Sequence, residues 1–259
     1  MKTIIYILII ISTLFIQSCS NKELSIPELP PKESFTIDFT DFVETNKTES
    51  SNWQQAKKTI LIWDTLINKK MEVPIASFPG KEYNVEPTYQ SENKWLWEYS
   101  FPENINSHSA KLFGTLKGSS IYWEMFISKE GEYKDFMWFF GNSASDNKSV
   151  NWTIFNSPDD NTEKLKIEYE QIAEGIYKID YIDIIIEEDI KNNSFLKFDN
   201  NNDNENFKSK YQIYNKENNN LIEIEYSPNN KNGRVIDSFF FKDNIWHCWA
   251  IDYKNIDCE

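Results

Sequence analysis

Apolar residues recur at every second position along most of the chain beyond Pro87. The first such run is aromatic at alternate positions, with charged or small residues between them: Trp95, Trp97, Tyr99 and Phe101. Because successive strand residues point to opposite faces, this run predicts a strand with one buried and one wet face. Such strands favour an antiparallel sheet, since parallel strands covered on both sides read as continuous apolar runs.

The same alternation returns along the rest of the chain, in sets that begin at Ala110, Ile121, Phe136, Val150, Leu165, Tyr177, Phe207 and Ile222. The third of these sets places Phe136, Trp138 and Phe140 on one buried face. Short turn signals lie between the runs, and Asn232-Gly233 is of the kind that tight hairpins favour. The pattern predicts a mainly β fold: an antiparallel up-and-down meander of about ten strands, as a half-barrel or a two-layer sheet.

One segment has the period of a helix instead. Between Ser51 and Lys70 the larger apolar residues recur at steps of three and four: Trp53, Ala56, Ile60, Trp63 and Ile67. Ser51 or Asn52 can cap the start, and Pro74 is expected to prevent continuation. We therefore expect an amphipathic helix near 51–70 that packs on one face of the sheet.

The N-terminus has the form of an export signal. Lys2 precedes an apolar run from Ile4 to Ile16, which is too short to span a bilayer comfortably. The sequence Ile16-Gln17-Ser18-Cys19 resembles the lipobox of bacterial lipoproteins, although Gln17 departs from the usual small residue. The resemblance implies that residues 1–18 are removed and that Cys19 is acylated. A plain secretory signal and an uncleaved anchor are the alternatives.

Charge limits the partners. The 259-residue chain has 41 acidic and 27 basic residues, a formal net charge of -14, and Arg234 as its only arginine. A nucleic-acid backbone requires a basic face, so we expect no nucleic-acid partner. An anionic surface is also repelled by anionic lipids, so attachment to a membrane is expected through the lipid on Cys19. The predicted location is the bacterial cell envelope, on the outer membrane, with the periplasmic and surface-facing sides both open.

The expected organisation has three parts. Residues 1–18 are the signal peptide, and residues 19–32 are the lipidated cysteine and a tether containing Pro27, Pro30 and Pro31. Residues 33–259 form a single β-rich domain. Within it, Asp199 to Asn206 is a polar, Asn-rich run that resembles a calcium loop only in composition, because the required twelfth-position Glu is replaced by Lys210. We interpret it as a mobile loop.

Two cysteines remain once Cys19 is acylated. Cys248 and Cys258 form an even pair in an exported chain, which predicts a disulfide. The alternative is a metal site at His247 and Cys248. With only two histidines in the chain and no Cys-x-x-Cys or His-x-x-x-His spacing, we expect neither a metal nor a cofactor.

Candidate functional residues are few. Arg234 can grip a ligand carboxylate, or it can form an ion pair with Asp237 or another acid and fix the C-terminal hairpin. The aromatic strand faces can stack sugars, but a half-buried sheet uses such faces for its core. Aromatic residues on the opposite faces need another explanation, among them Tyr122, Phe126 and Phe139. No Gly-x-Ser-x-Gly elbow or phosphate-binding glycine loop occurs, and no catalytic residue is predicted.

Several of these motifs together resemble uncharacterised secreted lipoproteins of Bacteroidetes-type bacteria. The resemblance rests on the Trp95 to Phe101 run, on Trp123 to Gly131, on Asp135 to Gly141, and on an ending that contains Trp246-His247-Cys248-Trp249. It implies an envelope lipoprotein with a β-rich body and no assigned activity. The leading hypothesis is a non-catalytic binding or structural role with an envelope protein, lipid or glycan as candidate partner. The alternative is a glycan hydrolase that uses an Asp/Glu pair.

Overall fold

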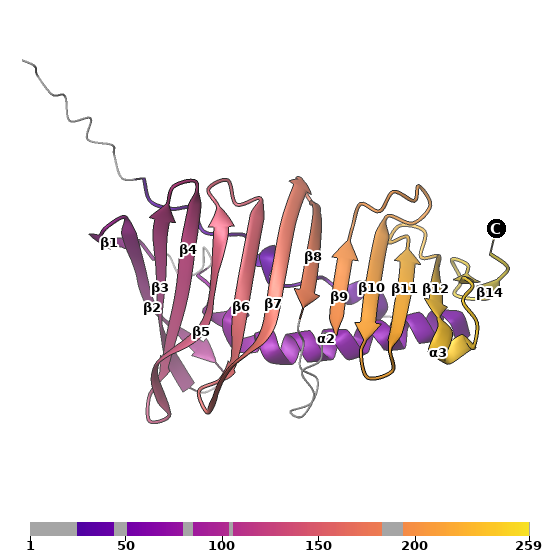
Figure 1. Cartoon of the computed structure of the whole chain (residues 1–259), viewed down its shortest axis with the longest axis horizontal. Coiled ribbons are helices and arrows are strands. Elements are labelled where there is room, and N and C mark those ends of the chain that lie inside the picture. Colours follow the sequence, from indigo (N-terminus) through magenta and orange to yellow (C-terminus); the bar gives the residue numbers. More distant parts are fainter. Residues whose placement is uncertain (1–24, 44–50, 80–84, 104–105, 183–193, 259) are drawn as a thin grey trace, which may run out of the picture.

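The computed structural model describes residues 25–43, 51–79, 85–103, 106–182 and 194–258. These residues form one antiparallel sheet in which fourteen strands follow one another in chain order (Figure 1). The strands are β1 (Thr88–Ser91), β2 (Lys94–Glu103), β3 (Asn106–Lys117), β4 (Ser120–Lys129), β5 (Tyr133–Ala144), β6 (Ser149–Ser157), β7 (Asp160–Ala173), β8 (Ile176–Ile182), β9 (Phe195–Asp199), β10 (Ser209–Asn215), β11 (Asn220–Tyr226), β12 (Gly233–Asp237), β13 (His247–Trp249) and β14 (Asn255–Ile256). The predicted antiparallel up-and-down sheet is confirmed. It is not closed, and the expected number of about ten strands was too low.

Among the described residues, one long helix, α2 (Ser51–Ser77), and three short helical segments accompany the sheet: η1 (Lys32–Ser34), α1 (Thr40–Val43) and α3 (Ser238–Phe241). Helix α2 runs along the sheet across the strands, as Figure 1 shows. It contacts β12, β13 and β14 at one edge and β2 near the other. We call the covered side the inner face and the opposite side the outer face.

Helix α2 begins at Ser51, where the sequence places it, but it continues to Ser77. The expectation that Pro74 ends the helix was therefore wrong. Pro74 lacks the N–H that would bond one turn back, yet it is buried and lies within the last turn, where only one such bond is lost. The Ser77 hydroxyl donates to the Pro74 carbonyl at 3.0 Å and closes the end.

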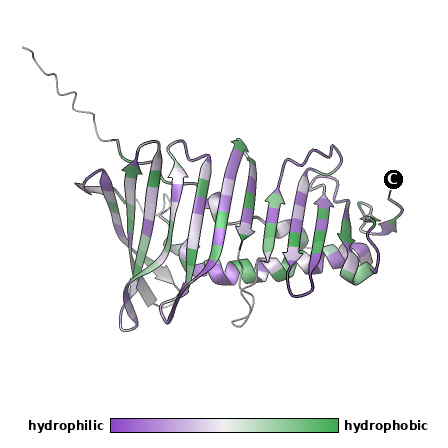
Figure 2. Cartoon of the chain, in the orientation of Figure 1, coloured by the Kyte–Doolittle hydropathy of each residue, from purple (hydrophilic) through white to green (hydrophobic). Residues whose placement is uncertain are grey.

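The core lies between α2 and the inner face. Alternation along the strands is visible as green and purple bands in Figure 2. Trp152 is 1% exposed, its ring stacks on Phe35 at 4.6 Å, and its Nε1 donates to the Ser34 hydroxyl at 3.0 Å. Position 141, beside this tryptophan, requires a glycine, because a Cβ there would lie 2.5 Å from the Trp152 ring. Fully buried aromatic side chains run along the whole sheet: Trp53, Trp123, Trp152, Trp249, Tyr181, Tyr226, Phe35, Phe42, Phe78, Phe101 and Phe139.

Strand β5 departs from simple alternation. Its register shifts where it pairs with β4: Met125 is opposite Phe139, and Phe126 is opposite Met137. Trp138 is therefore an extra residue in the strand, a β-bulge, and it is buried together with Phe139. The prediction that Phe140 shares the buried face was wrong, because the bulge reverses the faces; Phe139 belongs to the core and Phe140 to the outer face.

The strands that the alternation did not predict have five residues or fewer: β1, β9, β12, β13 and β14. Strands β1, β13 and β14 have four, three and two residues, too few for a period to show. Phe207 lies before β10 rather than in it. Gly233 is the first residue of β12 and not part of the turn. A glycine is needed there because a Cβ would lie 2.3 Å from the Trp249 ring.

Residues 25–31 lie against the body. Pro27 and Pro30 are buried, and the Asn147 side chain donates to the carbonyls of Glu28 and Leu29 at 3.2 and 3.1 Å. The second half of the expected tether is therefore part of the folded body. Cys19 and the signal peptide lie outside the described residues.

Candidate functional site

The outer face of β2–β6 carries a group of large apolar side chains that no described helix covers. We call it the outer aromatic patch, and all of its members are only partly buried: Leu96, Phe113, Tyr122, Phe126, Met137, Phe140 and Phe155. The rings of Phe113 and Phe126 lie 5.9 Å apart, and Phe140 lies 5.8 Å from Phe155. Cross-strand neighbours therefore shield one another while one side of the patch stays open to solvent.

A polar row runs beside this patch, across β5–β8. Strand register places Asn142 opposite Asn151, Asn151 opposite Glu168, and Glu168 opposite Asp180. Neighbouring strands are about 4.8 Å apart, so the row is about 14 Å long. Among the described residues, the side chains of Asn142, Asn151 and Glu168 have no hydrogen-bond partner, and all three are exposed. Their donors and acceptors are open to a ligand.

Hollows adjoin the patch on two sides. One of about 460 Å³ lies over β6–β8 and is lined by residues that include Asn151, Thr153, Lys166, Glu168 and Asp180. Another of about 760 Å³ lies over β2–β5 and is lined by residues that include Glu98, Ser109, Lys111, Ser128 and Asp135. The outer face of β2–β8 thus has an apolar centre with polar hollows beside it.

The lysines of this region are held by rings and carboxylates. Lys94 lies 4.1 Å from the Phe113 ring centroid and 3.2 Å from the Glu124 carboxylate. Lys117 lies 4.2 Å from the centre of the Tyr122 ring. Burial, and secondly the negative charge of Glu124, raise the pKa of Tyr122, so its hydroxyl is a neutral hydrogen-bonding group at pH 7.

The outer face of β8–β12 is different, because ion pairs occupy most of its strands beside a single stacked pair of rings, Phe195 and Tyr214 at 5.5 Å. Lys197 pairs with Asp180 at 2.6 Å, Lys178 with Asp199 at 3.1 Å, and Lys210 with Glu223 at 3.1 Å. Burial by itself would raise the pKa of Glu223, but hydrogen bonds from Gln212 and Lys210 outweigh it and lower that pKa. We call these pairs, together with Arg234 and Glu225, the charge ladder.

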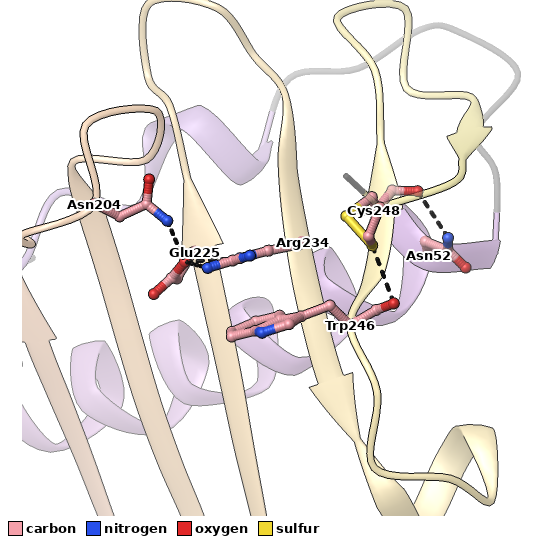
Figure 3. The surroundings of a disulfide bond; sticks show 7 residues. Asn52, Asn204, Glu225, Arg234, Trp246 and Cys248 are labelled. Atoms are coloured by element: carbon pink, nitrogen blue, oxygen red, sulfur yellow. Dashed lines mark hydrogen bonds and ion pairs between the residues drawn. A yellow bond between two sulfur atoms is a disulfide. The ribbon is translucent and has the colours of Figure 1, made fainter.

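Arg234 is fully engaged in that ladder. Its Nη2 lies 2.6 Å from the Glu225 carboxylate, and its guanidinium stacks over the Trp246 ring at 4.2 Å (Figure 3). The partner is Glu225 rather than Asp237, because Glu225 is directly opposite Arg234 in the register of β11 and β12. Asp237 instead accepts hydrogen bonds from the backbone N–H groups of Phe239 and Phe240 at the start of α3. The geometry gives Arg234 the ion-pair role.

The Asn-rich run is held by the same acid. The Asn202 and Asn204 side-chain amides each donate to the Glu225 carboxylate at 3.1 Å. Glu225 is 5% exposed, so four donors surround a nearly buried carboxylate. The interpretation of residues 199–206 as a mobile loop is thus at odds with these contacts, and the contacts could not be seen in a composition.

The two C-terminal cysteines are brought together. Their sulfur atoms lie 2.08 Å apart, the length of a disulfide bond, beside the start of α2 (Figure 3). The Asn52 side chain donates to the Cys248 carbonyl at 2.8 Å, and the Asn52 backbone N–H donates to Asn255 at 3.2 Å. The cysteine pair therefore fixes the end of the chain against the helix.

The described residues offer little catalytic geometry. His108 is 1% exposed on β3, whereas His247 stacks on Phe241 at 3.7 Å near the opposite edge. His247 also lies 2.9 Å from Asp243, and that hydrogen bond lowers the pKa of the Asp243 carboxyl. Within the described ranges, no three His, Cys, Asp or Glu side chains are grouped so that they could hold a metal.

Sequence reasoning missed the polar row and half of the patch. It recognised Tyr122 and Phe126 as outer-face aromatics, which the structure confirms, but placed Phe140 in the core and gave no role to Asn142 or Asn151. Strand register supplies the missing signal: Asn142 and Asn151 are nine residues apart in the sequence, Asn151 and Glu168 are seventeen apart, and only strand pairing makes them adjacent.

Comparison with known proteins gives no relative: no family model, no curated protein and no solved structure matches this chain. In the part of the chain that the structure describes, no helix is both long and apolar enough to cross a bilayer. By its fold and surface, the protein is an open up-and-down sheet. Helix α2 covers one face, and the other face is divided between the outer aromatic patch and the charge ladder.

Proposed function

We propose that this chain is a lipid-anchored protein of the bacterial cell envelope that binds a partner without catalysing a reaction, through the outer face of β2–β8. The observation that carries the proposal is a contrast within the outer face: charged side chains on one half pair with one another, and many side chains on the other half have no such partner. The charge ladder neutralises its own side chains, whereas the outer aromatic patch and the polar row leave apolar surface and hydrogen-bonding groups unused. Exposed apolar clusters with a polar rim are typical of binding sites.

The anchor is the lipidated Cys19, proposed from the signal sequence. Because residues from Ser25 onward belong to the body, only residues 19–24 lie between the lipid and the folded chain. Even fully extended, six residues reach about 20 Å. The body would therefore stay close to the membrane surface, and its partner would be a component of that surface or of the adjacent envelope layer.

A glycan hydrolase is the second candidate, since Glu168 and Asp180 are opposite each other beside a hollow. Hydrolysis of a glycosidic bond needs one carboxyl kept protonated as the acid, usually by an apolar pocket. Glu168 is exposed to water, and the Asp180 carboxylate lies 2.6 Å from Lys197, so neither carboxyl lies in an apolar pocket. This environment supports binding over hydrolysis.

The binding claim is tested with the lipidated protein in detergent micelles, immobilised and exposed to a detergent extract of envelope. We expect retained material to fall at least tenfold when Phe113 and Phe140 are both changed to Leu, and to stay unchanged for Tyr214→Leu. Tyr214 is a matched control, because it is a partly buried outer-face aromatic on β10. Equal retention by the wild type and the double variant would contradict the proposal.

Two further measurements address the anchor and the alternative. Labelled palmitate should enter the wild type and not Cys19→Ser; equal labelling would remove the anchor. Glycan hydrolysis by purified protein that is abolished by Glu168→Gln, with an unchanged melting temperature, would favour the hydrolase instead.

A further inference from the structure

We infer that the partner of the outer face is a neutral glycan chain that lies across strands β3–β7. This inference rests on the proposed binding function and adds the chemical class of the ligand. Its basis is that the outer aromatic patch and the polar row adjoin on β4 and β5, where Tyr122 is opposite Asn142 and Phe140 lies two residues from Asn142.

The outer aromatic patch meets the polar row on β5. Phe140 and Asn142 lie two residues apart on β5, as do Thr153 and Asn151 on β6, so both members of each pair point outward. Two strand residues span about 7 Å, and each row advances by about 4.8 Å per strand. The line through Phe140 continues to Thr153 on β6 and Lys166 on β7, so a ligand that follows the polar row meets the Phe140 ring at the β5 end. Tyr122 on β4 is opposite Asn142 and extends the polar row with a second ring.

A sugar chain has the complementary form. A pyranose ring carries C–H bonds on its faces and hydroxyl groups around its rim, so one unit can stack on an aromatic ring while its rim donates and accepts hydrogen bonds. Asn142 and Asn151 provide both donors and acceptors, and Glu168 provides acceptors. Acyl chains would leave these groups unpaired, which is costly when they lose water.

Charge points to a neutral glycan. Glu168 and Asp180 are opposite each other in the polar row, and the chain as a whole has a formal charge of -14. The lysines beside the polar row have partners of their own: Lys166 lies 3.8 Å from Glu163, Lys178 lies 3.1 Å from Asp199, and Lys117 lies over the Tyr122 ring at 4.2 Å. Carboxylated or sulfated sugars would meet the two acids of the row on a chain of negative net charge.

An extended peptide fits less well. Peptides usually add to the backbone at a sheet edge, where main-chain groups are unpaired. The patch and the polar row instead occupy the face of strands that are paired on both sides. Only side chains are presented there, as stacking on a face requires.

The test measures binding of the lipidated protein in micelles to soluble glucan, mannan, xylan and galactan, with alginate and polygalacturonate as anionic comparisons. We expect saturable binding to at least one neutral chain and none to the anionic pair. Phe140→Leu should weaken binding about tenfold, which corresponds to about 1.4 kcal/mol. Asn151→Ala should weaken it severalfold, and Phe140→Tyr should restore it by keeping the ring.

Controls separate the outcomes. Tyr214→Leu should bind as the wild type does, and each variant should melt within a few degrees of it. Binding only to the anionic chains, or equal binding by Phe140→Leu, would overturn the inference. If no polysaccharide binds while envelope material is still retained through Phe113 and Phe140, the glycan class is wrong and the proposed binding function survives. If neither binds, both are wrong.

Discussion

The two halves of the outer face carry different kinds of side chain toward solvent. On β8–β12, ion pairs join β8 to β9, β10 to β11 and β11 to β12, and one aromatic pair, Phe195 and Tyr214, lies between them. On β2–β6 the same positions carry partly buried phenylalanines, whose exposed rings gain nothing from water. The inner face is alike in both halves, with buried aromatics from Trp95 to Trp249. The two halves therefore differ on the outer face and not in the core, which is why we propose the outer face of β2–β8 as the binding surface.

The largest expected effect is a loss of stability on changing a residue of the inner face, and it tests how far the two faces differ. Trp152→Ala removes a side chain that is 1% exposed and stacked on Phe35, so we expect a loss of about 3–5 kcal/mol in the free energy of unfolding. Phe140→Ala, on the outer face directly after the core-facing Phe139, should cost about 1 kcal/mol because its ring is partly exposed to water. Denaturant unfolding measures both, and equal losses would contradict the distinction between the faces.

The next effect concerns the C-terminal edge. Cys258→Ser opens a loop with a sequence separation of ten residues, and the chain-entropy model gives a loss of about 2.5 kcal/mol. The contacts of Asn255 with the start of α2 should loosen with it. Denaturant unfolding with and without a reducing agent is the measurement. Wild type plus reductant should match the variant, and a wild type that is insensitive to reductant would argue against the disulfide.

A third effect breaks the charge ladder at its most buried point. Arg234→Gln leaves the Glu225 carboxylate 5% exposed with only Asn202 and Asn204 as donors, and we expect a loss of about 2 kcal/mol. Lys210→Gln is the matched control: it removes a more exposed partner, and such pairs contribute about 0–1 kcal/mol. Similar losses for the two variants would show that burial does not distinguish the members of the ladder.

The smallest effect is a pH dependence within the ladder. The folded-state pKa of Glu223 lies below its ordinary value of 4.5, so its stabilising contribution is present above the unfolded pKa. That contribution is lost as the pH falls through the lowered folded value. Because the side chain is partly exposed, the change should be under about 1 kcal/mol. Glu223→Gln should remove this part of the acid dependence of unfolding; an unchanged profile would contradict it.

Much of the architecture was readable from the sequence because it rests on local periodicity. Period two gave the antiparallel sheet, and the spacing from Trp53 to Ile67 gave the start and buried side of α2. The errors have local causes as well. The bulge at Trp138 reverses the faces of β5, and the buried Pro74 is accommodated in a last turn that the sequence pattern alone would end.

The candidate surface was harder to predict because it depends on register. Nothing in the sequence places Asn142 beside Asn151, or Glu225 beside Arg234; both pairs arise when neighbouring strands align. Residue composition predicted a mobile loop for residues 199–206, whereas Asn202 and Asn204 donate hydrogen bonds to Glu225. Side chains that form a surface through cross-strand pairing leave no spacing signal along one strand.

The central claim is that one half of the outer face binds and the other does not, and oxidative footprinting tests it most directly. Hydroxyl radicals modify exposed aromatic and methionine side chains, so the lipidated protein is oxidised with and without the envelope material or glycan that it retains. The account predicts protection of Phe113, Met137 and Phe140, with Phe195 and Tyr214 on β9 and β10 oxidised as before. Protection that is equal on both halves, or confined to Phe195 and Tyr214, would contradict it.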